Sequence, residues 1–141
     1  MRVIIRTIPH KDQPYNTVGM WRYNLKEKTL LIEVSECSDP WREFLIAIHE
    51  YVEAMLCLHA GITAQEVTDF DLWWEKEDNK TSPNEPGDDP ASPYRREHCS
   101  ATGIERMIAS YLNIDWFKYE RELWKLGEDY GNGPQTLDRS K

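Results

Sequence analysis

The chain has few of the features expected of a secreted or membrane protein. Its 141 residues include three widely spaced cysteines and no Cys-x-x-Cys pair. An odd cysteine count, with no signal-peptide pattern at the start, favours a reducing, cytoplasmic setting. The longest apolar stretch is interrupted by His49, Glu50 and Glu53, so we expect no membrane-spanning segment.

Positive charge is also scarce. The 17 lysines and arginines are outnumbered by 25 acidic residues, which gives a formal net charge of -8. Because a nucleic-acid backbone or an anionic membrane needs a basic partner surface, we expect neither as a partner. The length fits one domain that buries a core without disulfides. We predict a single domain over residues 1–127 and a flexible, polar C-terminal tail over 128–141; the oligomeric state is left open.

Three short segments near the N-terminus have the composition of β-strands. Residues 3–8, 18–23 and 29–34 are rich in β-branched and aromatic side chains and are bounded by turn residues. The second and third segments are joined by "NLKEK", a length that suits a hairpin. We therefore predict a small antiparallel sheet of about three strands.

Helix signals follow the strands. Asp39 can cap a helix that begins at Pro40, and Gly61 can end it. Thr63 and Glu66 have the spacing of a capping box, which predicts a second helix from about residue 64.

Two more helices are predicted after a loop. Residues 78–93 contain four prolines and almost no apolar side chains, which indicates a loop. A third helix, with Ser92 as cap and Pro93 in its first turn, should reach about Leu112, and residues 115–127 should form a fourth. Strands followed by helices indicate an α+β fold in which three to four helices pack on one small sheet.

Ionisable residues interrupt the most apolar of these helices. His49 and Glu53 are four residues apart and lie on one face, whereas Glu50 is about a quarter turn away. On a helical wheel they fall at the edge of the expected core arc, which comprises Phe44, Leu45, Ile48, Val52, Met55 and Leu56. Burying carboxylates is costly unless they are paired, protonated or bound to a metal. The pattern matches a His-Glu-x-x-ligand metal motif in which Glu50 activates a metal-bound water as general base.

The third helix offers the missing ligand. His98 and Glu105, seven residues apart, follow the edge of its expected buried arc, which comprises Tyr94, Ala101, Ile104, Ile108 and Leu112. Glu97 falls nearer the centre of that arc and is an alternative ligand or a partner of one. We therefore expect His49 and Glu53 to face His98, with Glu105 or Glu97 nearby.

The hairpin, the His-Glu helix and a later helix with acidic and small residues resemble the small zincin-type metallopeptidases, especially the ImmA/IrrE-like group. The resemblance covers about residues 18–112. It implies a zincin-like fold, His49 as first ligand, Glu50 as base, Glu53 in the place of the family's second histidine, and a third ligand from "EHCSATGIERMIASYL", either His98 or Glu97. It also implies a peptide or protein substrate.

Glutamate at position 53 affects the choice of metal. Zinc is the first expectation from the resemblance, but a carboxylate makes the site harder, so manganese and magnesium are alternatives. Tyr94, at the start of the third helix, is a candidate for stabilising a developing oxyanion.

Two other functions are compatible with the same residues. Glu50, Glu53, Glu66 and Asp69 have the spacing of the all-helical nucleoside triphosphate pyrophosphatases, which hold magnesium. Those folds lack the N-terminal strands predicted here, and Glu66 already has a role in the capping box. The other alternative is a non-catalytic interaction domain, for example of phage or mobile-element type, in which the buried histidines and glutamates form a structural polar network.

Overall fold

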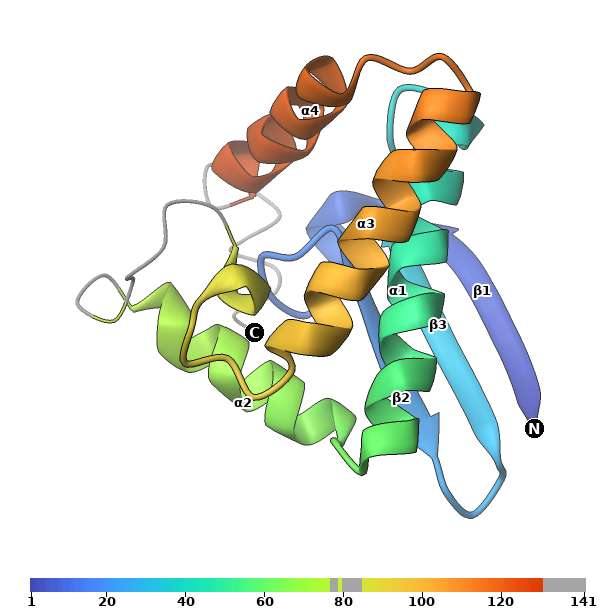
Figure 1. Cartoon of the computed structure of the whole chain (residues 1–141), viewed down its shortest axis with the longest axis vertical. Coiled ribbons are helices and arrows are strands. Elements are labelled where there is room, and N and C mark those ends of the chain that lie inside the picture. The colour runs from blue at the N-terminus through green and yellow to red at the C-terminus, as the bar shows by residue number, and fades with distance from the viewer. Residues whose placement is uncertain (77–78, 80–84, 131–141) are drawn as a thin grey trace.

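Three strands and four α-helices form the described part of the chain in the computed structural model, which describes residues 1–76, 79 and 85–130 (Figure 1). The strands are β1 (Arg2–Ile8), β2 (Gly19–Asn24) and β3 (Thr29–Ser35), and they form one sheet in the order β1-β3-β2. The predicted α+β class and the three strands are therefore confirmed.

The sheet is mixed. β2 and β3 form the predicted antiparallel hairpin, but β1 pairs with β3 in parallel, so the prediction of a wholly antiparallel sheet was wrong for that pair. The connection between β1 and β2 includes a short 3-10 helix, η1 (His10–Asp12), and carries the chain past the end of β3 to its other edge. Gln13, which is fully buried, anchors this crossing because its side-chain amide donates to Ser35 Oγ at 3.0 Å.

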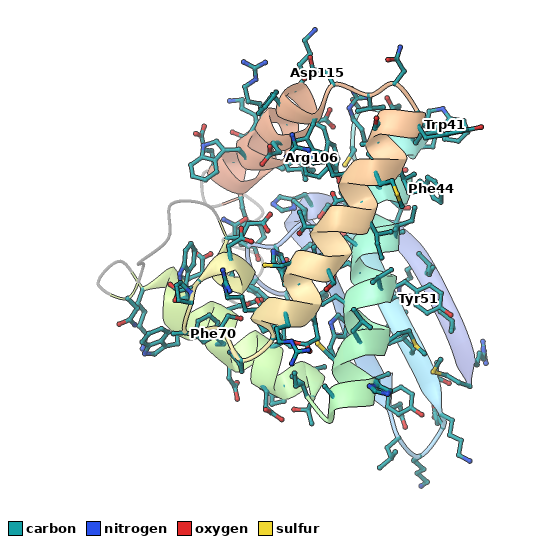
Figure 2. The ribbon with its side chains drawn as sticks, in the orientation of Figure 1. Trp41, Phe44, Tyr51, Phe70, Arg106 and Asp115 are labelled. Atoms are coloured by element: carbon teal, nitrogen blue, oxygen red, sulfur yellow. The ribbon has the colours of Figure 1, made fainter. Side chains whose placement is uncertain are left out.

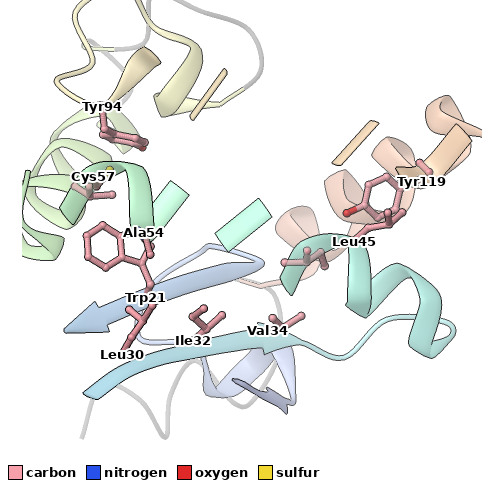
Figure 3. Packing of buried hydrophobic residues seen from close by; sticks show 12 residues of the cluster. Trp21, Leu30, Ile32, Val34, Leu45, Ala54, Cys57, Tyr94 and Tyr119 are labelled. Carbon is pink, nitrogen blue, oxygen red and sulfur yellow. The ribbon is translucent and has the colours of Figure 1, made fainter. Parts of the chain in front are cut away.

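The hydrophobic core lies between the sheet and the first long helix, α1 (Pro40–Ala60). Leu30, Ile32 and Val34 alternate along β3 and are essentially inaccessible, as expected for the inner face of a central strand. Figure 3 shows these side chains beneath α1, with Trp21 of β2 beside them.

Both predicted ends of the first helix and the predicted start of the second are confirmed. The Asp39 side chain caps α1 by accepting from the Arg42 amide at 2.9 Å, and Gly61 ends it in the left-handed region at φ 78°. The second helix, α2 (Ala64–Glu75), carries both hydrogen bonds of the capping box formed by Thr63 and Glu66.

The later helices differ from the prediction at their ends. α3 (Arg95–Tyr111) begins later than expected, because Ser92 Oγ accepts from the Tyr94 amide in a preceding turn instead of capping the helix. After the described part of the proline-rich segment, which contains a 3-10 helix η3 (Pro86–Asp88), α3 packs against α1. α4 (Trp116–Asp129) is capped by Asp115 and extends past residue 127, so the predicted domain boundary falls inside it. The rest of the predicted tail, 131–141, lies outside the described residues.

The buried faces of α1 and α3 are rotated from the predicted arcs. His49, Glu50 and Glu53 lie within the buried stripe of α1, and His98 and Glu105 lie within that of α3. Several apolar residues assigned to the core are instead substantially exposed, namely Phe44, Met55, Leu56 and Ile104. Small residues on the two helices, including Ala54, Ala101 and Ala109, leave room for polar side chains between them. Trp41, Phe44 and Tyr51 project from α1 toward solvent (Figure 2).

No helix among the described residues has, by itself, the length and apolar composition of a membrane span. α1 and α2 taken together meet that test by length and composition, but they are bent by 114° at their junction.

Candidate metal centre

Three side chains from two helices converge at the interface between α1 and α3. His49 and Glu53 of α1 and His98 of α3 offer ligand atoms that lie within 4.8 Å of one another, and all three side chains are buried. Glu53 Oε2 lies 3.2 Å from His49 Nε2 and 3.0 Å from His98 Nδ1. A tetrahedral zinc with bonds of ordinary length would separate its ligand atoms by about 3.3 Å. The donor set and its spacing therefore fit a divalent cation.

Each of these side chains is held by a second polar contact. His49 Nδ1 lies 2.9 Å from Glu105 Oε1, and the Tyr119 hydroxyl donates to the other oxygen of Glu105 at 2.6 Å. The Trp21 indole donates to Glu53 Oε1 at 3.3 Å. These contacts fix the orientation of both α1 side chains.

His98 is oriented by the segment that precedes α3. Its Nε2 lies 2.9 Å from Glu85 Oε2 and 3.3 Å from Asp88 Oδ1, although neither contact has hydrogen-bond alignment. Both histidines thus turn one nitrogen toward Glu53 and the other toward a carboxylate. Carboxylates in this outer position set the tautomer and the ring orientation of metal-binding histidines.

The charges of the cluster depend on one another. Burial disfavours the charged form of every member, but the hydrogen bonds with Glu105 and Glu53 outweigh it and hold the pKa of His49 well above its ordinary value. Burial likewise acts to lower the pKa of His98, but the nearby carboxylates of Asp88, Glu53 and Glu85 outweigh it and raise that pKa. The pKa of Glu53 is lowered despite burial, because both histidines donate to it. Without a metal, the cluster therefore favours two imidazolium groups around an ionised Glu53.

Glu50 lies beside this cluster but takes no part in it. Its side chain is buried and lines the adjoining cleft, and among the described residues no hydrogen bond to its carboxylate is found. Burial, followed by the negative charge of Glu53, raises the pKa of Glu50 above its ordinary value. A carboxyl group with these surroundings is suited to accept a proton near neutral pH.

Two glycines make room for the site. A Cβ added at Gly19 would lie 2.7 Å from Glu50 Cγ, and one added at Gly87 would lie 2.4 Å from His98 Cγ. Backbone therefore packs directly against the proposed base and one proposed ligand, and any larger residue at either glycine would displace them.

A cleft of about 1010 Å³ opens onto the cluster. Its walls come from α2, α4, η3 and the segment that leads into β2. The described part of the proline-rich segment thus flanks the cleft.

Tyr94 also lines this cleft, but its hydroxyl is already engaged. It donates to Asp71 Oδ1, and Tyr15 donates to Asp71 Oδ2 at 2.7 Å. Burial raises the pKa of Asp71 to about 7, although both hydrogen bonds act in the opposite direction. Tyr94 would have to release Asp71 before it could stabilise an oxyanion, so that role stays a prediction.

The other two predicted ligands, Glu105 and Glu97, do not join the cluster of His49, Glu53 and His98. Glu105 is close but holds His49 instead of joining the three converging atoms. Glu97 is only half-buried and does not belong to the described ligand clusters, because the true buried face of α3 passes through His98 and Glu105. The sequence pattern gave no role at the site to Glu85, Asp88, Trp21, Tyr119 or Asp71. The only signal for Glu85 and Asp88 was their place in the acidic, proline-rich loop before His98.

The four carboxylates of the pyrophosphatase-like pattern are not brought together. The Glu66 carboxylate accepts a hydrogen bond from the Thr63 amide in the capping box. The exposed Asp69 carboxylate accepts one from Gln65 Nε2 at 2.7 Å. Neither residue lines the cleft that contains Glu50 and Glu53.

The arrangement combines three converging donor atoms, an adjacent carboxylate with no hydrogen bond among the described residues, and a cleft large enough for a substrate segment. Such a set of groups can bind a divalent cation and accept a proton from a nucleophile. In comparisons with protein-family models, curated proteins and solved structures, none matches this chain.

Proposed function

We propose that this chain is a metal-dependent hydrolase of zincin-like type that cleaves peptides or proteins. His49, Glu53 and His98 hold the divalent cation, and Glu50 is the general base. The observation that carries this proposal is the orientation of the two histidines. Each turns one nitrogen toward Glu53, at the proposed metal position, while a carboxylate faces its other nitrogen. That is the usual setting of metal-bound histidines.

The donor set favours zinc. Two imidazole nitrogens and one carboxylate oxygen form a common ligand set of catalytic zinc sites, with a further position left for water or substrate. Here the carboxylate, Glu53, comes from α1 and the second imidazole, His98, comes from α3. Glutamate at position 53 thus leaves the site with a complete donor set, because histidine is supplied from the other helix. Manganese is the nearest alternative.

Glu50 and Glu105 have different roles in the proposed hydrolysis. Bound at these donors, the cation would act as a Lewis acid that polarises a carbonyl and lowers the pKa of water. Glu50 accepts a proton from a water molecule in the cleft, and the resulting hydroxide attacks the carbonyl carbon. The C–N bond breaks, and Glu50 returns the proton to the leaving amine. Glu105 keeps the His49 ring oriented throughout.

Metal analysis and two variants test this proposal. Protein purified without an affinity tag should contain about one divalent ion per chain. Glu50→Gln should keep the ion and lose about 10²- to 10⁴-fold in peptide hydrolysis, because only the base is removed. His49→Ala should lose the ion. Absence of metal, together with no thermal shift on adding zinc, manganese or magnesium, would exclude the enzyme.

A non-catalytic interaction domain is the second candidate. Both distances to Glu53 Oε2 are also ordinary for hydrogen bonds, so two imidazolium groups and the carboxylates could form a closed network without a cation. The same metal analysis separates the two, since a purely structural network requires no ion.

A further inference from the structure

The cleft beside the proposed metal centre is strongly acidic. Among the described residues that line it, nine are aspartate or glutamate, whereas Arg121 is the single arginine and no lysine is present. A divalent cation at His49, Glu53 and His98 would offset only a minority of this charge. The potential inside a narrow, partly water-excluded cleft is stronger than on an open surface.

The acidic groups occupy more than one wall. Glu75 of α2, Glu85 beside η3 and Glu120 of α4 all line the cleft and are exposed. Glu50 lies deeper, buried and with no hydrogen bond among the described residues. A bound segment would therefore meet negative charge at the rim and the carboxyl group of the proposed base further in.

Aromatic side chains on α4 stand among these acids. Phe117 and Trp124 line the cleft with 67% and 57% of their surfaces exposed. The guanidinium of Arg106 already lies 5.5 Å from the centre of the Trp116 ring and 6.0 Å from that of Phe117 (Figure 2 shows Arg106 between α3 and α4). The aromatic residues of α4 thus accept a cationic side chain of this same chain. Aromatic faces combined with carboxylates favour lysine and arginine over acidic side chains.

On the basis of the proposed hydrolase function, we propose that the substrates are cationic peptide segments, whose lysine or arginine side chains lie against the acidic and aromatic wall of α4. Their aliphatic stems would pack on Phe117 and Trp124 while their charges face the glutamates. Polyanions such as nucleotides would be repelled by the same wall.

Peptide binding tests this preference without requiring turnover. Three short fluorescent peptides of equal length, with lysine, glutamine or glutamate at matched positions, are titrated into zinc-loaded Glu50→Gln protein and followed by anisotropy. The lysine peptide should bind at least tenfold more tightly than the glutamine peptide, and the glutamate peptide least tightly. Raising the ionic strength should reduce these differences.

Charge variants locate the site. Glu128 of α4 also lines the cleft. Glu120→Gln combined with Glu128→Gln should weaken binding of the lysine peptide about fivefold, since each removes one cleft charge. Glutamine at 128 can still accept the 2.6 Å hydrogen bond from the Trp124 indole. Arg121→Gln should strengthen binding. The matched control is Glu27→Gln with Glu36→Gln, two exposed residues outside the cleft lining that change the net charge equally and should alter binding less than twofold.

Equal binding of the three peptides, or equal loss in the cleft and control variants, would overturn this inference. The second result would mean that the net charge of the chain, and not the cleft, attracts the peptide. If the lysine preference is found but Glu50→Gln fails to affect hydrolysis in the parent protein, the hydrolase proposal fails while the cationic site stands. If hydrolysis behaves as proposed but the three peptides bind without a charge preference, the hydrolase proposal stands and the cationic-peptide inference fails.

Discussion

His49 and His98 approach the same carboxylate oxygen from two different helices. The second nitrogen of each ring faces a carboxylate, which is Glu105 for His49 and Glu85 with Asp88 for His98. A buried histidine held in this way has little freedom to rotate. This rigidity is what a metal site requires and also what makes its surroundings intolerant of added volume.

Gly87 tests how tightly His98 is held. A Cβ in Gly87→Ala would fall 2.4 Å from His98 Cγ and 2.5 Å from Nδ1, the proposed ligand atom. We expect zinc affinity to fall at least tenfold and the free energy of unfolding to drop by about 1–3 kcal/mol. Calorimetric titration and denaturant unfolding measure the two effects.

The matched control is Gly103→Ala. Gly103 lies in α3, and an added Cβ there meets nothing within 4 Å. Alanine should leave zinc binding unchanged and stabilise the helix by about 0.5–1 kcal/mol. Wild-type zinc affinity in Gly87→Ala would show that His98 does not bind the ion from its observed position.

Among the helices, α1 and α3 carry the site and α2 carries one wall of the cleft. α2 begins at a local signal, the capping box of Thr63 and Glu66, which operates independently of the metal cluster. Glu66 therefore has a structural task that accounts for its presence without any ligand role.

Substitutions at the capping box separate this interpretation from a pyrophosphatase-like magnesium site. Thr63→Ala should cost about 1 kcal/mol of folding free energy, because the Glu66 amide loses its acceptor. Glu66→Gln should be nearly neutral, since glutamine can also accept from the Thr63 amide. Neither change should alter metal affinity in a calorimetric titration. A large loss of magnesium or zinc binding in Glu66→Gln would instead support the carboxylate pattern of that enzyme class.

At the scale of the whole molecule, the proposed metal would join α3 to α1, the helix that covers the sheet. An ion that binds only the folded chain stabilises it by mass action, by about 4 kcal/mol at a thousandfold excess over Kd. For a chain of this size we expect zinc to raise Tm by on the order of 10 °C. Chelation should reverse the rise.

This stabilisation should depend on pH in a defined direction. The pKa values of His49 and His98 in the metal-free protein lie above their ordinary values, so the protonated form of each ring is favoured. These ion pairs stabilise the metal-free fold below the ordinary histidine pKa, and their contribution is lost as pH rises through the raised pKa values. Each ligand nitrogen must lose its proton to solvent before it can bind zinc, so zinc affinity should rise with pH, by up to about hundredfold per unit.

Thermal scans with and without zinc between about pH 6 and 8 measure this effect, over the range in which unperturbed histidine loses its charge. The zinc-dependent shift in Tm should grow across that range and should be absent in His49→Ala. A shift that stays constant, or that is larger at the acidic end, would contradict protonated ligands in the metal-free state.

Local features of the sequence determined the elements and half of the site. Asp39, Gly61 and Thr63 act on neighbouring backbone groups, so the ends of α1 and the start of α2 followed from residue order alone. The four-residue spacing of His49 and Glu53 placed them on one helical face for the same reason.

Tertiary structure decided the rest. The parallel pairing of β1 depends on a crossing that strand composition does not encode, and the choice of His98 over Glu97 depends on which face of α3 meets α1. A wheel based on apolar side chains misplaced both buried faces, because a polar site in the core breaks the rule on which the wheel rests. The contact of His98 with Glu53, the contact of Glu105 with His49, and the acidic cleft bring together residues far apart in the sequence, and they exist only after the helices pack.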